Sequence, residues 1–147
     1  MAIALSHGGA TQYASSERSK EILVGTKEGV AILQQDAAGA WKLALRTLPD
    51  QHISSIIMPP KTDLVFAGAF HGSIHASADG CRTWERRDTG LTQDDVFSMA
   101  WVERDGGVRL YAGTEPAHLF YSDDFGGNWT ELPGIRDVES IPNWSFP

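Results

Sequence analysis

Three carboxylates in short polar segments of this sequence could act as an acid and a base. Glu28, Glu115 and Asp94 are the candidates, because glycoside hydrolysis uses two carboxyl groups, one acting as acid and the other as base or nucleophile. Acidic residues are numerous, however, with 19 Asp and Glu against 12 Lys and Arg. Solvated loop carboxylates are therefore the simpler interpretation, and we assign no catalytic residue.

Histidines offer a second kind of chemistry. His71 and His75 lie four residues apart, and His118 follows farther along the chain. A metal site needs three or four converging ligands, whereas His71 and His75 flank a Gly–Ser pair that is typical of a turn. No phosphate-binding loop, dinucleotide fingerprint or Cys/His metal spacing is present. We predict no metal site and no cofactor.

Composition narrows the possible partners and the compartment. The net charge of −7 and the scattered basic residues argue against nucleic acid and against an anionic membrane, which are bound by clustered Lys and Arg. The single Cys81 cannot form an internal disulfide, which fits a reducing compartment. The start, MAIALSHGG, lacks a basic segment and a long apolar stretch. We predict a cytoplasmic protein.

Two sets of landmarks recur along the chain at the same intervals of 43 and 45 residues. One set is Trp41, Trp84 and Trp129, and the other is Gly25, Gly68 and Gly113. Because both sets drift by the same two residues, the intervals indicate a structural repeat. A period in the low forties without a helical pattern is typical of four-stranded β-propeller blades.

Each repeat divides into four short strands, except that the first repeat shows only its second, third and fourth strands. The apolar runs predict first strands at Ile53–Met58 and Val96–Val102, second strands at Leu64–Ala69 and Leu110–Thr114, third strands at Ser73–Ser77 and His118–Ser122, and fourth strands at Thr83–Arg87 and Asn128–Leu132. No segment has a convincing helical period, so the predicted fold is all-β. The predicted repeats cover residues 21–52, 53–95 and 96–140, and residues 141–147 begin a fourth.

The polar turns that end in tryptophan resemble a motif of a known family of repeat proteins. SADGCRTW and SDDFGGNW resemble the S-x-D-x-G-x-x-W Asp-boxes of neuraminidase-type (BNR) repeats and of sortilin-type and YVTN/BNR-like repeat proteins, and QQDAAGAW keeps two of the four positions. Cys81 stands where the second box should have glycine. The resemblance implies a structural role for the box residues, which are Asp36, Trp41, Ser77, Asp79, Trp84, Ser122, Asp124, Gly126 and Trp129.

The repeat count predicts an incomplete ring. About three four-stranded blades, permuted by one strand, form an arc that cannot close, because propellers have about four to eight blades. We expect half of a six- or seven-bladed propeller, completed by a homodimer or truncated from a longer chain. The register makes Ile141–Phe146 the first strand of the fourth unit. Residues 1–20 are predicted to be an arm or to supply an extra strand at Thr11–Ser15.

The loops at one end of such an arc are the expected binding site. This mouth carries Lys27, Phe70, His71 and His118. The resemblance favours a non-catalytic binding or scaffold module with a glycan or protein ligand at this mouth. The alternative is a glycoside hydrolase, exo-sialidase-like or xyloglucanase-like, or a fragment of one, although the arginine and tyrosine pattern of a neuraminidase is not recognisable.

Overall fold

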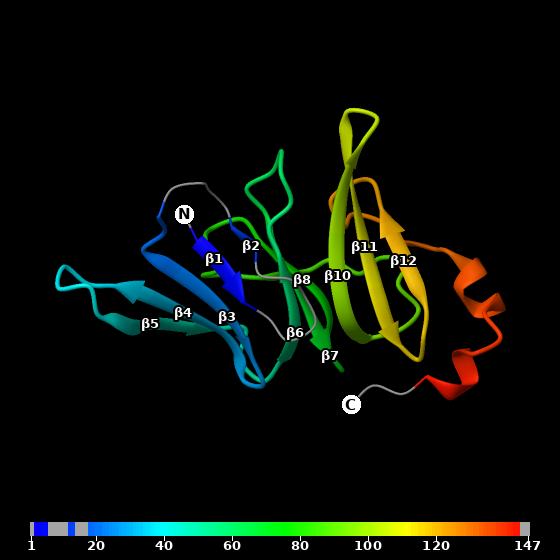
Figure 1. Ribbon diagram of the computed structural model, residues 1–147, viewed down its shortest axis with the longest axis horizontal. Helices are drawn as coiled ribbons and strands as arrows, with labels where there is room; N and C mark the ends of the chain where they lie inside the picture. Colours follow the sequence, from blue (N-terminus) through cyan, green and yellow to red (C-terminus); the bar gives the residue numbers. More distant parts are fainter. Residues whose placement is uncertain (1, 6–11, 14–17, 145–147) are drawn as a thin grey trace.

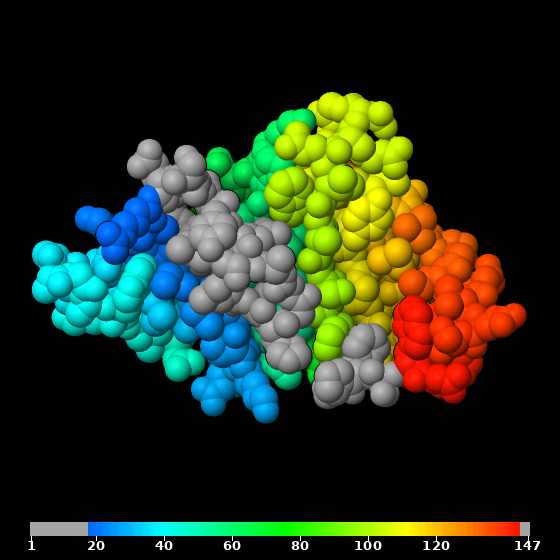
Figure 2. Space-filling view, in the orientation of Figure 1, coloured from blue at the N-terminus to red at the C-terminus, as the bar shows by residue number. Residues whose placement is uncertain are grey.

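The computed structural model describes residues 2–5, 12–13 and 18–144, and this part of the protein is all-β, as predicted. The strands form three sheets that follow one another along the chain (Figure 1). The second sheet lies between the first and the third, which do not meet to close a ring (Figure 2). The propeller prediction therefore agrees with the structure at the level of separate, mainly antiparallel sheets in an open row.

The first sheet contains the predicted second, third and fourth strands of the first repeat. Its strand order is β2 (Gln12–Tyr13), β1 (Ala2–Leu5), β3 (Glu21–Thr26), β4 (Gly29–Gln35) and β5 (Trp41–Thr47). Most pairs are antiparallel, but β1 runs parallel to β3 and takes the edge that the sequence left without a first strand. Strand β1 was not predicted, and β2 lies within the proposed segment Thr11–Ser15, the rest of which is outside the described residues.

The second and third sheets have four antiparallel strands each, close to the predicted positions. The second sheet consists of β6 (His52–Ile57), β7 (Val65–Phe70), β8 (Ser73–Ser77) and β9 (Glu85–Arg86). The third consists of β10 (Asp95–Arg104), β11 (Gly107–Glu115), β12 (Leu119–Ser122) and β13 (Thr130–Glu131).

The predicted strand at Ile141–Phe146 is wrong over its described part. After β13 the chain forms two 3₁₀ helices, η1 (Pro133–Asp137) and η2 (Ile141–Asn143), in which no residue is buried. Two physical reasons account for the difference. Pro142 lies in the first turn of η2, where its fixed φ suits a helix start. In a closed ring, a strand formed by Ile141–Phe146 would join the first sheet by pairing with the edge of β3. That edge is already paired with β1.

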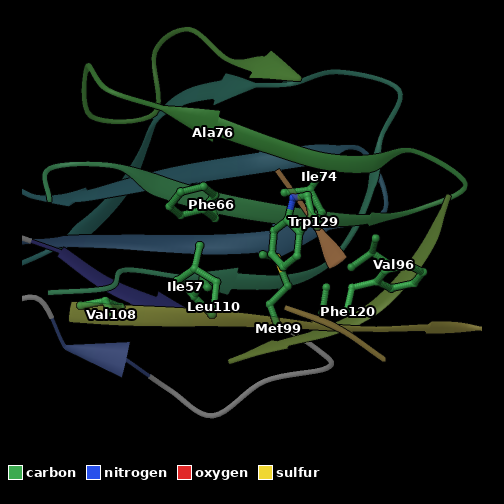
Figure 3. Close-up of a cluster of buried hydrophobic side chains, with 11 residues drawn as sticks. Ile57, Phe66, Ile74, Ala76, Val96, Met99, Val108, Leu110, Phe120 and Trp129 are labelled. Atoms are coloured by element: carbon green, nitrogen blue, oxygen red, sulfur yellow. The ribbon is translucent and has the colours of Figure 1, made fainter. Parts of the chain in front are cut away.

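Alternate residues of the second sheet face opposite neighbours, and each face belongs to a separate core. Ala67 and Ala69 pack with Leu23 and Ile32 of the first sheet. Between the second and third sheets lies a larger cluster built around Phe66, Phe120 and Trp129 (Figure 3). Its other buried members are Ile57, Ile74, Ala76, Val96, Met99, Val108, Leu110 and Ala112. The sheets are thus held together face to face.

Candidate functional site

The second and third Asp turns have nearly identical hydrogen bonds. Asp79 accepts hydrogen bonds from the backbone N–H groups of Arg82 and Thr83, both at 2.9 Å. Asp124 accepts the backbone N–H of Asn128 at 2.9 Å. The preceding serines act alike in the two turns. Ser77 Oγ donates to Asp79 at 2.9 Å, and Ser122 Oγ donates to Asp124 at 2.7 Å.

These hydrogen bonds favour the charged form of each carboxylate. Bonds from the side chain and backbone of Thr83 hold the pKa of Asp79 well below its usual range. For Asp124 burial acts to raise the pKa, but bonds from Asn128 and Ser122 outweigh it and the net shift is downward. A carboxylate engaged by its own turn, with a lowered pKa, is a poor general acid, so the geometry supports a structural role.

The first turn keeps the aspartate but differs in its surroundings. Asp36 accepts the N–H groups of Ala38 and Ala40 at 3.0 Å, and it forms an ion pair with Lys42 at 2.7 Å. The Lys42 ammonium is the main cause of a lowered Asp36 pKa. Trp41, which ends this turn, is 41% exposed, whereas Trp129 is 4% exposed.

Cys81 occupies the glycine position of the second box in the conformation that favours glycine. Its φ is 67°, close to the 78° of Gly126 in the third box, and both backbone N–H groups bond the box serine at 2.9 Å. The side chain is buried in the core between the first two sheets. Burial raises the pKa of the Cys81 thiol to about 12, so it does not supply a reactive thiolate.

The opposite end of the sheets carries a cluster of rings, which we call the loop-end cluster: His52, Phe70, His71 and Asp95. The rings of Phe70 and His71 have centroids 4.2 Å apart, and His52 meets Phe70 edge-on at 6.0 Å. Asp95 fixes the arrangement through one oxygen, which accepts the His71 backbone N–H at 2.9 Å and lies 2.6 Å from Nδ1 of the same histidine. The cluster therefore joins the second sheet to the third.

Two non-glycine residues where β7 connects to β8 have positive φ. His71 has a φ of 60° and Ser73 of 67°. Ser73 takes the place that Gly29 has in the first sheet, since its N–H bonds the Asp94 carbonyl at 2.8 Å just as the Gly29 N–H bonds the Gln51 carbonyl. Side chains at positive φ cost free energy and often mark functional segments. This strain presents the His71 side chain, which is largely exposed, at the loop end.

The other predicted mouth residues do not join this cluster. Lys27 is exposed in the turn between β3 and β4 of the first sheet. His118 is mostly buried in the third sheet, stacked on Phe120, with Nδ1 2.8 Å from Glu131, which also pairs with Arg136. His75 Nε2 lies 2.9 Å from the Gly72 carbonyl, and burial lowers the pKa of this histidine. Among the described residues no three His, Cys, Asp or Glu side chains are placed to hold a metal ion.

The three candidate carboxylates lie on different sheets or connections. Glu28 forms a long ion pair with Arg46 in the first sheet, at 3.8 Å, and Asp94 bonds Arg86 of the second at 3.1 Å. Glu115 ends β11 directly opposite Asp95 of β10. Cross-strand partners have side chains on the same face, so the carboxylate nearest to Glu115 in register is Asp95.

The sequence places His52 and Asp95 in the connections between repeats, beside the predicted mouth, and Asp95 is a candidate carboxylate together with Asp94. His52 could have been found from the register, because it is the cross-strand partner of Phe70. The repeat alone gives no signal for the contact between His71 and Asp95, because it depends on how two sheets are packed. Glu131, the partner of His118, lies in the same sheet and could have been found from the register, which places Glu131 opposite Phe120.

Comparison with known proteins adds no family: no family model matches the sequence, and neither does any curated protein. Over the described residues, no helix has the length and apolar character needed to cross a membrane. The functional argument therefore rests on the geometry of this chain.

Proposed function

We propose that the chain is a segment of an Asp-box β-propeller and acts as a non-catalytic binding module. Three observations support the propeller. The landmarks of the sheets recur at intervals of 43 and 45 residues, two of the Asp turns share one hydrogen-bond pattern, and the faces of neighbouring sheets pack on each other. Loops at one end of such a scaffold vary without disturbing the core and commonly carry binding sites.

The loop-end cluster is the observation that carries the binding proposal. Phe70 and His71 offer ring faces, while Asp95 and Glu115 offer carboxylate oxygens beside them. Rings that stack on C–H surfaces, together with acceptors for hydroxyl donors, suit a polyhydroxylated ligand. We therefore favour a glycan over a flat apolar ligand.

The negative charge at the loop-end cluster favours some classes of glycan over others. Asp94, Asp95 and Glu115 lie at or beside the loop-end cluster, and the whole chain carries a net charge of −7. Acidic sugars meet like charge there, which costs binding free energy. We propose a neutral oligosaccharide as the ligand class.

The test is titration of the isotope-labelled chain with neutral oligosaccharides and, separately, with sialylated ones, followed by NMR chemical shifts. Neutral sugars should shift the amides of residues 70–73, and Phe70→Ala should weaken binding by about two- to tenfold, since an aromatic contact contributes about 0.5–1.5 kcal/mol. Leu45→Ala, an exposed apolar site outside the loop-end cluster, is the matched control and should bind normally. Absence of shifts with every neutral sugar, or equal loss in both variants, would rule out the proposal.

A glycoside hydrolase is the competing function, and one observation favours it. Asp95 and Glu115 are a cross-strand pair of carboxylates, and glycoside hydrolysis requires two carboxyl groups. A panel of aryl glycosides distinguishes the two functions. Turnover that is lost in Glu115→Gln and in Asp95→Asn, but kept in Glu28→Gln, would establish the enzyme and overturn the non-catalytic module.

A further inference from the structure

The two interfaces between neighbouring sheets are built in the same way. The indole Nε1 of Trp84, in the second sheet, donates to Thr47 Oγ1 of the first at 3.1 Å. The indole Nε1 of Trp129, in the third sheet, donates to the Arg87 carbonyl of the second at 3.0 Å. Each box tryptophan therefore packs against the outer-strand end of the preceding sheet.

A glycine in the second strand of the repeat lets the next sheet approach closely. A Cβ atom placed on Gly25 would lie 3.0 Å from Cγ2 of Ile53, and one on Gly68 would lie 2.7 Å from Cγ1 of Val96. Ile53 and Val96 are equivalent positions of the inner strands β6 and β10. Each interface thus joins a glycine-bearing face to an aliphatic inner strand and a box tryptophan.

The outer face of the third sheet corresponds in position to the surface that the second sheet buries, although Tyr121 takes the place of Ala76 and lies under the Arg109 guanidinium. On the second sheet the face comprises Phe66, Gly68, Ile74 and Ala76, and 45 residues later the third sheet has Tyr111, Gly113, Leu119 and Tyr121. The large members of the first set are at most 1% exposed, whereas those of the second are only half-buried. Among described atoms, a Cβ on Gly113 would meet only Ser98 Oγ of its own sheet, at 2.9 Å.

The outer face of the first sheet carries the complementary half. Leu43 pairs with Leu33 in the register, and Trp41 pairs with Gln35, so both point away from the second sheet. They are 52% and 41% exposed. An irregularity in the pairing at Leu33 puts Leu45 opposite Ile32, and hence on the face toward the second sheet.

We propose that a second copy of this chain covers both faces, with the first sheet of one copy packed on the third sheet of its partner. The third sheet presents the glycine-bearing face and the first sheet presents the box tryptophan of an interface that the chain already makes twice within itself, although the inner strand β1 of the first sheet runs parallel to its neighbour, unlike β6 and β10. The first and third sheets lie on opposite sides of the second sheet (Figure 1), so the contact is head-to-tail. Two such contacts close a ring of six sheets, within the known range for propellers. The inference does not depend on the ligand proposed above.

In this assembly Trp41 has the role that Trp129 has within the chain. Its indole meets the segment after β13 of the partner, as the Trp129 indole meets the segment after β9. The dimer does not need one copy to add a strand to the first sheet of the other, because β1 already pairs with the edge of β3.

The first test is a matched pair of charge substitutions on one strand. Leu43→Arg places a charge in the proposed interface and should raise the dimer dissociation constant at least about tenfold, since burying an unpaired charge is costly. Leu45→Arg lies two residues away on the other face and should change it less than threefold, about the size of a surface effect. Sedimentation equilibrium measures both, and circular dichroism checks that both variants fold.

The second test uses the asymmetry of a head-to-tail contact. Gly113→Leu places a bulky side chain on the outer face of the third sheet, where the partner must approach closely, and should also weaken the dimer. Mixing the Leu43→Arg and Gly113→Leu chains should restore association, because the mixed dimer has one interface in which both faces are native. Recovery in the mixture supports the proposal. A monomeric wild-type chain, equal disruption by Leu45→Arg, or no recovery in the mixture would each overturn it.

Discussion

Trp41 and Trp129 hold the same position in the repeat and have opposite environments. Both follow a turn in which an aspartate accepts backbone N–H groups. Trp129 is 4% exposed, and its indole bonds the second sheet, whereas Trp41 is 41% exposed, and in the described part of the chain no sheet lies on its outer side. The difference shows that the Asp turn folds from local hydrogen bonds, while the burial of its tryptophan depends on a neighbouring sheet.

The largest expected effect separates these two tryptophans. Trp129→Ala should lower the free energy of unfolding by about 3–5 kcal/mol, as removal of a large buried aromatic does. Trp41→Ala should lower it by less than about 1 kcal/mol when the chain is dilute enough to be monomeric. Urea unfolding followed by circular dichroism measures both. Equal losses would mean that the two environments are energetically alike, which contradicts the comparison.

A smaller effect separates the equivalent glycines Gly68 and Gly113. Gly68→Ala forces a methyl group against Val96 of the next sheet and should destabilise the chain by about 1–3 kcal/mol, the usual cost of overpacking. Gly113→Ala meets only the hydroxyl of Ser98, which can rotate, and should cost less than about 0.5 kcal/mol. Thermal unfolding compares the pair. A Gly113→Ala variant as unstable as Gly68→Ala would show that the outer face of the third sheet is already packed.

The smallest expected effect is a loss of stability at acidic pH. It should be similar for the first Asp turn, with Asp36, and the second, with Asp79. The pKa values of Asp36 and Asp79 are both lowered from 3.8 in the folded chain. A lowered carboxyl pKa stabilises the fold above the unfolded value, and that stability is lost as the pH falls below about 4 toward the folded value. Stability should therefore decline from pH 4 to pH 2.

Asparagine variants show which turn causes the decline. Asp79→Asn and Asp36→Asn should each flatten the dependence on pH. Salt should reduce the Asp36 contribution more, because its main cause is the exposed Lys42 ion pair, which salt screens. Urea unfolding at several pH values measures the slope. An unchanged slope in Asp79→Asn would mean that the box hydrogen bonds do not stabilise its charge.

The sequence could predict the strands because their signals are local. Apolar runs between turns located the third strand of the second repeat at Ser73–Ser77, where β8 lies. The box motif also marked Cys81 as a stand-in for glycine, and its positive φ agrees. The strand predicted at Ile141–Phe146 is wrong over its described part, because an apolar pattern does not reveal whether the edge of a sheet is free to pair. The contact of His71 with Asp95 joins two sheets, so no single repeat encodes it.

Sedimentation equilibrium of the unmodified chain tests the central claim most directly, that the outer faces of the first and third sheets are two halves of one interface. We expect a concentration-dependent species of twice the 16.0 kDa of a single chain. A single chain mass at every concentration up to about 1 mM, where even an interaction of about 4 kcal/mol would be visible, would contradict it.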